Sequence, residues 1–169
     1  MAVGLAFVAC GPVRRPDGGT GLLQPPASAP AFSALDQEGK TRTLGEYRGK
    51  PVVLYFYPKD GTPGCTKEAC AFRDAWKRIQ DRGAVVLGVS RDSVEKHKKF
   101  VDEHKLPFTL LVDEDGTVCT AYGVKSSFGL PARVTFVLDR DGHVARTFPD
   151  VDPGIHVDQV LAALDALPK

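Results

Sequence analysis

The sequence has no excess of charge of either sign. Its 22 Lys and Arg residues are balanced by 21 Asp and Glu residues, so the formal net charge is +1. A nucleic-acid-binding surface usually shows as a strong basic excess, and we therefore expect no nucleic-acid partner. The one basic cluster, Lys96-His97-Lys98-Lys99, is interpreted as the solvated face of a helix.

Cysteine is also scarce. Four cysteines in 169 residues are too few for a disulfide scaffold, and they lack the two close pairs that a zinc site uses. Cys119, in the apolar stretch "TVCTAYGV", is predicted to be a small core residue. We expect no metal and no other cofactor, because the histidines too are scattered without metal-ligand spacing: His97, His104, His143 and His156.

Long apolar runs are absent, and no stretch is long enough to span a bilayer. The short run "MAVGLAFVAC" resembles the end of a bacterial lipoprotein signal, in which Cys10 would be lipidated and would tether the protein to a membrane. The run is short and no Lys or Arg precedes it, which a start codon assigned too far downstream would explain. We therefore expect a protein of the bacterial cell envelope, lipid-anchored or periplasmic. An unprocessed tail on a cytoplasmic protein is the alternative.

The chain is predicted to have three parts. Residues 1–10 form the signal segment. Residues 11–30 are rich in Gly, Pro, Ala and Ser, a composition that buries too little surface to fold, so they are predicted to be a flexible tether. Residues 31–169 suit one globular domain.

Strands and helices alternate along this domain. The apolar runs "VVLYFY", "GAVVLGVS" and "FTLLVD" are typical of strands buried on both faces. Helices are expected at about 63–82, 93–105, 118–122 and 156–167, and "RVTFVLD" and "HVARTF" flank a hairpin turn. The pattern predicts an α/β domain with a mixed central sheet and helices on both faces.

The segment "DGTPGCTKEAC" follows the first buried strand, at the end of the sheet where α/β proteins place their functional sites. Thr62 suits a helix N-cap and Pro63 the first helical position. Cys65 then lies in the first turn, where free backbone N–H groups and the helix dipole favour its thiolate. Gly64 allows a close approach to the site. Thr-Pro-Gly is thus interpreted as a helix start that activates a sulfur.

Cys70 lies five residues further along the same helix. Helix geometry separates the two Cα atoms by about 8.6 Å and by about 140° around the axis, whereas a disulfide requires a Cα separation below about 7 Å. The two cysteines cannot join while the helix is intact. A permanent disulfide and a pair of unrelated thiols are the weaker interpretations. A redox pair coupled to local unwinding is the stronger one.

The segment "YFYPKDGTPGCTKEACAFRD" resembles the active-site segment of peroxiredoxins, in the form found in the bacterioferritin comigratory protein, or peroxiredoxin Q, subfamily. Pro58, Thr62 and Cys65 match the family pattern Pro-x3-Thr-x2-Cys. Cys70 matches the subfamily's resolving cysteine, and Arg133 in "GLPARVTFVLDRDG" matches the catalytic arginine. The resemblance runs from about Ala31 to the C-terminus and implies a thioredoxin-like fold.

The resemblance also implies a mechanism. Cys65 would attack the O–O bond of a peroxide and become a sulfenic acid, which Cys70 would convert to a disulfide that an external thioredoxin-type dithiol reduces. Arg133 would stabilise the thiolate and the charge on the leaving oxygen. Because both cysteines lie on one chain, turnover would need no second subunit; we expect a monomer, with a dimer as the alternative.

Three further side chains are given supporting roles by the resemblance. The Thr62 hydroxyl would hydrogen-bond the thiolate and the incoming oxygen. Pro58 would shield the site from water. Glu68 would orient Arg133, although a carboxylate exposed at a helix N-terminus is an equal interpretation of Glu68.

Two other classes of protein compete with a peroxidase. A thiol–disulfide oxidoreductase of the thioredoxin fold usually has C-x-x-C at this helix start, and a proline near the position of Arg133. A non-catalytic envelope module that binds copper through two thiols would need a further histidine or sulfur ligand nearby, and the sequence assigns none.

Overall fold

The computed structural model describes residues 11–168. Its larger sheet contains strands β1 (Ser33–Asp36), β2 (Thr41–Thr43), β3 (Val52–Phe56), β4 (Val85–Ser90), β5 (Thr109–Val112), β8 (Val134–Leu138) and β9 (Val144–Phe148). A small hairpin contains β6 (Ser126–Ser127) and β7 (Leu130–Pro131). The helices are η1 (Leu44–Tyr47, a 3-10 helix), α1 (Pro63–Asp74), α2 (Trp76–Gln80), α3 (Val94–His104), α4 (Thr117–Ala121) and α5 (His156–Asp165). The predicted signal segment and Cys10 lie outside the described residues.

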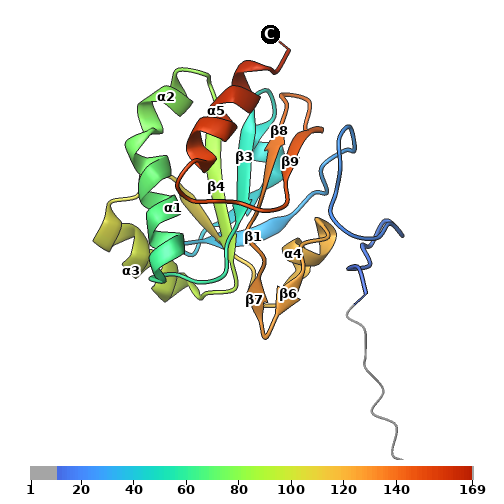
Figure 1. Cartoon of the computed structure of the whole chain (residues 1–169). Coiled ribbons are helices and arrows are strands. Elements are labelled where there is room, and N and C mark those ends of the chain that lie inside the picture. The colour runs from blue at the N-terminus through green and yellow to red at the C-terminus, as the bar shows by residue number, and fades with distance from the viewer. Residues whose placement is uncertain (1–10, 169) are drawn as a thin grey trace, which may run out of the picture.

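The sheet is mixed, with the strand order β2-β1-β5-β4-β3-β8-β9. Figure 1 shows β4, β3, β8 and β9 side by side. Strands β3, β4 and β5 are parallel, and β8 runs antiparallel to β3. In this register Phe56, the last residue of β3, pairs with Val134, the first residue of β8. The start of β8 therefore lies beside the end of β3, which is where α1 begins.

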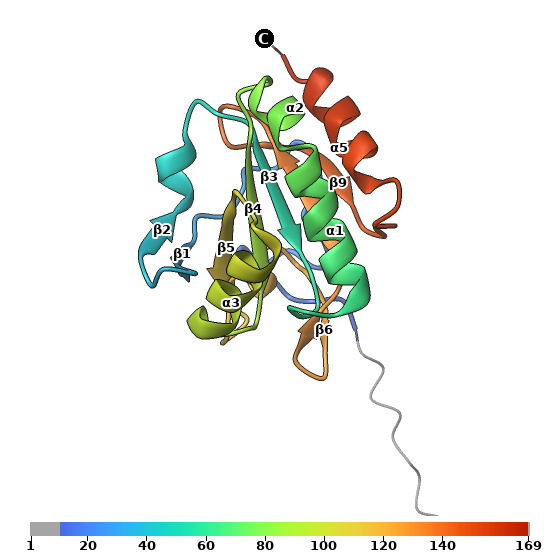
Figure 2. The ribbon, with the colours of Figure 1, turned by 90° about the vertical axis from the view of Figure 1, so that its left-hand side faces the viewer.

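Side chains of β3 alternate between two cores, as the two-residue period of a strand requires. Val53 and Tyr55 face one core together with residues of α1, α2, α3 and α5. Figure 2 shows α1 and α5 side by side on this face. Leu54 and Phe56 face the other core, to which α4 contributes Val118 and Cys119. The predicted mixed sheet with helices on both faces is confirmed.

The predicted flexible tether is wrong for part of its length, on the sheet face that also carries α4. Residues 22–30, here called the strap, were expected to belong to a flexible tether, but they pack on this face. Leu23 is 2% exposed, its backbone N–H donates to the Tyr122 carbonyl over 3.1 Å, and its carbonyl accepts from Thr147 Oγ1 over 2.9 Å. The helices on this face are short, α4 and the 3-10 helix η1, and the strap adds further apolar cover to it.

Gly123 allows the residue just before the strap, Gly21, to lie against its backbone. Gly123 has φ +72°, and a Cβ at this position would lie 1.9 Å from the Gly21 carbonyl oxygen. Only glycine combines this backbone conformation with so close a contact.

The predicted helix over about 63–82 is interrupted. Ala75 (φ −90°, ψ 4°) separates α1 from α2, so Trp76 begins a second short helix instead of continuing the helix of the two cysteines. Among residues 11–168, no helix has the length and apolar character needed to cross a membrane.

Candidate active site

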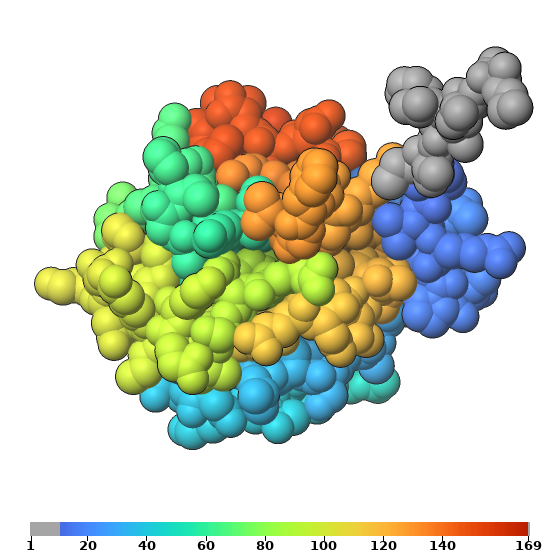
Figure 3. Space-filling model, turned by 90° about the horizontal axis from the view of Figure 1, so that it is seen from below, coloured from blue at the N-terminus to red at the C-terminus, as the bar shows by residue number. Residues whose placement is uncertain are grey.

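Cys65 lies in the first turn of α1, as predicted, and is 1% exposed. Thr62 is the N-cap residue and Pro63 the first helical residue. Figure 3 shows this end of the molecule, where the start of α1 lies next to the β6–β7 hairpin and the residues that follow β4. The sulfur is thus placed at the carboxyl end of the central strand β3 and at the positive end of a helix dipole.

Arg133 reaches Cys65 from the start of β8. Its Nη2 donates a hydrogen bond to Cys65 Sγ over 3.3 Å. Gly64 leaves room for this contact, because a Cβ there would lie 3.1 Å from Arg133 Nη2. The guanidinium thus places a permanent positive charge beside the sulfur.

Glu68 pairs with the other terminal nitrogen of Arg133. Arg133 Nη1 donates to Glu68 Oε2 in an ion pair. Glu68 is 1% exposed, so it is not the exposed carboxylate of the alternative interpretation. Burial works to lower the pKa of Arg133, but the charges of Glu68 and Cys65 outweigh it and raise that pKa.

Only one oxygen of the buried Glu68 carboxyl group has a hydrogen-bond partner among the described residues. Its Oε1 is buried and has no hydrogen-bond partner among the described residues. Burial raises the pKa of Glu68 to about 7, although the charge and the hydrogen bond of Arg133 act to lower it. The ion pair that holds Arg133 therefore depends on a carboxylate that is costly to ionise.

Thr62 has a partner that the sequence did not predict. Its hydroxyl donates to the Lys59 carbonyl over 3.1 Å and makes no N-cap hydrogen bond. Its single proton is therefore directed at the loop and not at Cys65. Pro58 is half-buried in the same loop, directly after Tyr57.

Cys70 lies on a different side of α1 from Cys65 and is half-buried. Its Sγ is 4.0 Å from Nδ1 of His104, the last residue of α3. Cys65, Cys70 and Cys119 are all free thiols. Cys119 is 2% exposed, and burial, aided by the charge of Asp113, raises its pKa far above its ordinary value. This thiol is a core residue, as predicted.

The loop that carries the site is held by a buried histidine that sequence reasoning missed. His97 Nδ1 lies 2.7 Å from Asp60 Oδ2, and His97 Nε2 lies 3.1 Å from the Leu111 carbonyl oxygen. Tyr57 donates to the other oxygen of Asp60 over 2.7 Å. His97 is fully buried, whereas the lysines beside it are exposed, so the basic cluster is a solvated face only for its lysines.

Comparison with known proteins identifies the family. Residues 26–147 match the AhpC/TSA family. The chain belongs to this family of peroxiredoxins. It is similar to peroxiredoxin bcp of Coxiella burnetii, with 48% identity over 143 residues that cover 80% of this chain and 95% of the relative. It is similar to the chloroplastic peroxiredoxin Q of Sedum lineare, with 49% identity over 83% of this chain and 77% of the relative.

A solved peroxiredoxin has the same fold. The crystal structure of peroxidoxin BcpB from Mycobacterium tuberculosis aligns with a TM-score of 0.79 and 38% identity, over 85% of this chain and 97% of that one. The thioredoxin-like fold and the peroxiredoxin Q resemblance are thereby confirmed, and the protein is a thiol-dependent peroxidase, an oxidoreductase.

The raised pKa of Glu68 predicts a pH-dependent stability. The folded protein binds this proton more tightly than the unfolded chain, so its contribution to stability is full below about pH 4.5 and is lost as the pH rises through about 7. Relative to Glu68→Gln, the wild type should lose on the order of 1–3 kcal/mol of unfolding free energy across that window. Urea unfolding of both proteins at pH 4.5, 6 and 8 measures the difference. A difference that grows in favour of the wild type with rising pH would show that pairing with Arg133 outweighs burial.

Proposed function

We propose that Cys65 is the peroxidatic cysteine of this peroxidase. The observation that carries the proposal is the contact of Arg133 Nη2 with Cys65 Sγ at 3.3 Å in the first turn of α1. The Cys65 thiolate attacks one oxygen of hydrogen peroxide or of an organic hydroperoxide, the O–O bond breaks, and water or an alcohol leaves. The sulfur is oxidised to a sulfenic acid, and the peroxide is reduced.

The residues around Cys65 have separate roles in this reaction. Arg133 stabilises both the thiolate and the charge that develops on the leaving oxygen. Glu68 acts through Arg133 as a positioning residue, since its carboxylate pairs with Nη1 of the guanidinium whose Nη2 contacts Cys65. Pro58 limits the access of water. Thr62 supports the incoming oxygen once its hydroxyl is released from the Lys59 carbonyl, its partner in the reduced protein.

Cys70 resolves the sulfenic acid within the same chain. The five-residue separation on α1 keeps the two sulfurs from bonding while the helix is intact, so the first turns of α1 unwind before the disulfide forms. A thioredoxin-type dithiol then reduces the Cys65–Cys70 disulfide. A monomer is sufficient for this cycle, because no step needs a thiol of a second chain.

Substitution of each cysteine tests the two roles. After reduced protein is mixed with hydrogen peroxide, Cys65→Ser should show no fast reaction, because the nucleophile is gone. Cys70→Ser should react at the wild-type rate but stop at the sulfenic acid. Stopped-flow Trp76 fluorescence, free-thiol titration and intact mass follow the reaction. Peroxide consumption by Cys65→Ser at the wild-type rate would disprove the assignment of Cys65. A Cys70→Ser protein that still forms an intramolecular disulfide would disprove that of Cys70.

We also propose that the protein is anchored to the cell envelope through a lipid on Cys10. The proposal is supported by the apolar run that ends at Cys10 in the sequence. Expressed from its natural gene, the protein should sediment with bacterial membranes, and Cys10→Ser should move it to the soluble fraction. Equal distribution of the two proteins between the fractions would contradict the anchor.

A further inference from the structure

The side chain of Cys70 on α1 lies next to the side chain of His104 on α3. Cys70 Sγ lies 4.0 Å from His104 Nδ1, which is the limit of a hydrogen bond that involves sulfur. His104 ends α3, and Cys70 lies in the middle of α1. The thiol of Cys70 therefore faces an imidazole, whereas the thiol of Cys65 faces a guanidinium.

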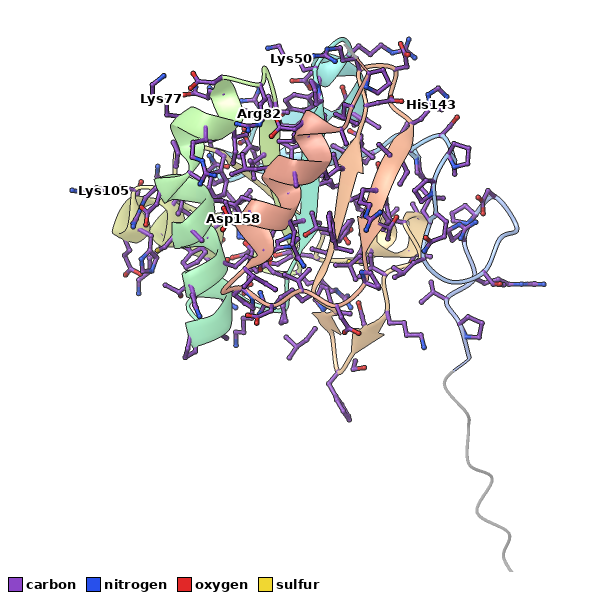
Figure 4. The ribbon with its side chains drawn as sticks, turned by 45° about the horizontal axis from the view of Figure 1, so that its top comes forward. Lys50, Lys77, Arg82, Lys105, His143 and Asp158 are labelled. Carbon is purple, nitrogen blue, oxygen red and sulfur yellow. The ribbon has the colours of Figure 1, made fainter. Side chains whose placement is uncertain are left out.

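One contact holds the backbone of His104 and another its ring. Arg73 Nη1 donates to the His104 carbonyl over 2.8 Å and so joins α1 to the end of α3. The ring packs edge-on against Phe100, with ring centroids 4.9 Å apart. The next residue, Lys105, has a left-handed backbone, and its side chain points outward, away from α1 (Figure 4).

The titratable groups near this thiol lie on α1 and α3. From α1, Arg73 pairs with Asp74 over 2.9 Å. The pKa of Arg73 is raised, first by Asp74 and further by the charge that Cys70 carries as a thiolate. From α3, the group that faces Cys70 is His104. The pairing of a thiol with an imidazole is a common way to generate a thiolate near neutral pH.

We propose that His104 is the base that accepts the thiol proton of Cys70. The inference rests on the proposed resolving role of Cys70. The proton moves from Cys70 Sγ to His104 Nδ1, which requires the tautomer with its proton on Nε2. The Cys70 thiolate then attacks the sulfur of the Cys65 sulfenic acid. The S–S bond forms, the S–O bond breaks, and the hydroxide that leaves takes up a proton to become water.

This arrangement gives the two cysteines separate activators. Arg133 prepares Cys65 for the peroxide, and His104 prepares Cys70 for the sulfenic acid. A change at His104 should therefore slow disulfide formation and leave the reaction with peroxide unchanged. His104 makes no contact with the peroxide, so it belongs to the resolving half of the cycle alone.

Alkylation of Cys70 in the Cys65→Ser protein tests the proton transfer without any peroxidase reaction. Iodoacetamide is added between pH 5.5 and 9.5, and mass spectrometry of the Cys70 peptide gives the rate. With His104→Gln added, alkylation at pH 7 should be about tenfold slower, and the pH at which the rate is half-maximal should rise by about one unit. Below the pKa of a thiol, a shift of one pH unit changes the thiolate fraction about tenfold. Above about pH 9.5 the two rates should converge.

His143→Gln is the matched control. His143 lies at the β8–β9 turn, at the opposite end of the sheet from the start of α1 (Figure 4), and its side chain is 47% exposed. This control should leave the alkylation profile unchanged. If His104→Gln leaves the profile unchanged too, or slows alkylation equally at every pH as a packing residue would, the proposal is wrong.

Single-turnover kinetics with hydrogen peroxide tests the consequence in the full chain. His104→Gln should form the sulfenic acid within twofold of the wild-type rate and should form the Cys65–Cys70 disulfide about tenfold more slowly at pH 7. An unchanged disulfide rate would overturn the role of His104. If the wild type forms no such disulfide, the resolving assignment of Cys70 fails instead, while the alkylation profiles still decide the proton transfer.

Discussion

One guanidinium joins the parts of this active site. Arg133 donates to Cys65 with one nitrogen and to Glu68 with the other, so the first and second turns of α1 are both tied to the start of β8. The sulfur and the carboxylate are each 1% exposed, and without this cation either charge would be costly to bury. A larger residue at Gly64 would press on the same guanidinium, because its Cβ would lie 3.1 Å from Arg133 Nη2.

The sheet brings these groups together from distant parts of the sequence. Because β8 runs antiparallel to β3, its first residue pairs with the last residue of β3, and Arg133 arrives where α1 begins. Apolar side chains that pack on both faces of the sheet keep β3 buried in the core. Helices supply most of it on one face, whereas α4 and the strap with Leu23 supply it on the other. The strap is thus part of the support of the site.

Local sequence patterns predicted the central strands and the start of the active-site helix. Apolar runs located the central strands, and Thr62, Pro63 and Cys65 located the start of α1 because caps are local signals. Contacts that depend on tertiary packing were not predictable. His97 appeared to belong to a basic surface, yet it is fully buried against Asp60. The strap belongs to a segment whose Gly, Pro, Ala and Ser content predicted a flexible tether, and nothing in that composition showed which sheet face lacked cover.

Arg133 contacts the first turn of a helix that we propose must open during turnover, so the position of Arg133 is the central claim. A double-mutant cycle in the Cys70→Ser protein tests it most directly, with the rate of sulfenic acid formation as the readout. Arg133→Met should slow that step about 100-fold. Glu68→Gln should slow it alone but add nothing once Arg133 is replaced, because Glu68 acts through Arg133. Full additivity of the two effects, or an unchanged rate in Arg133→Met, would contradict the account.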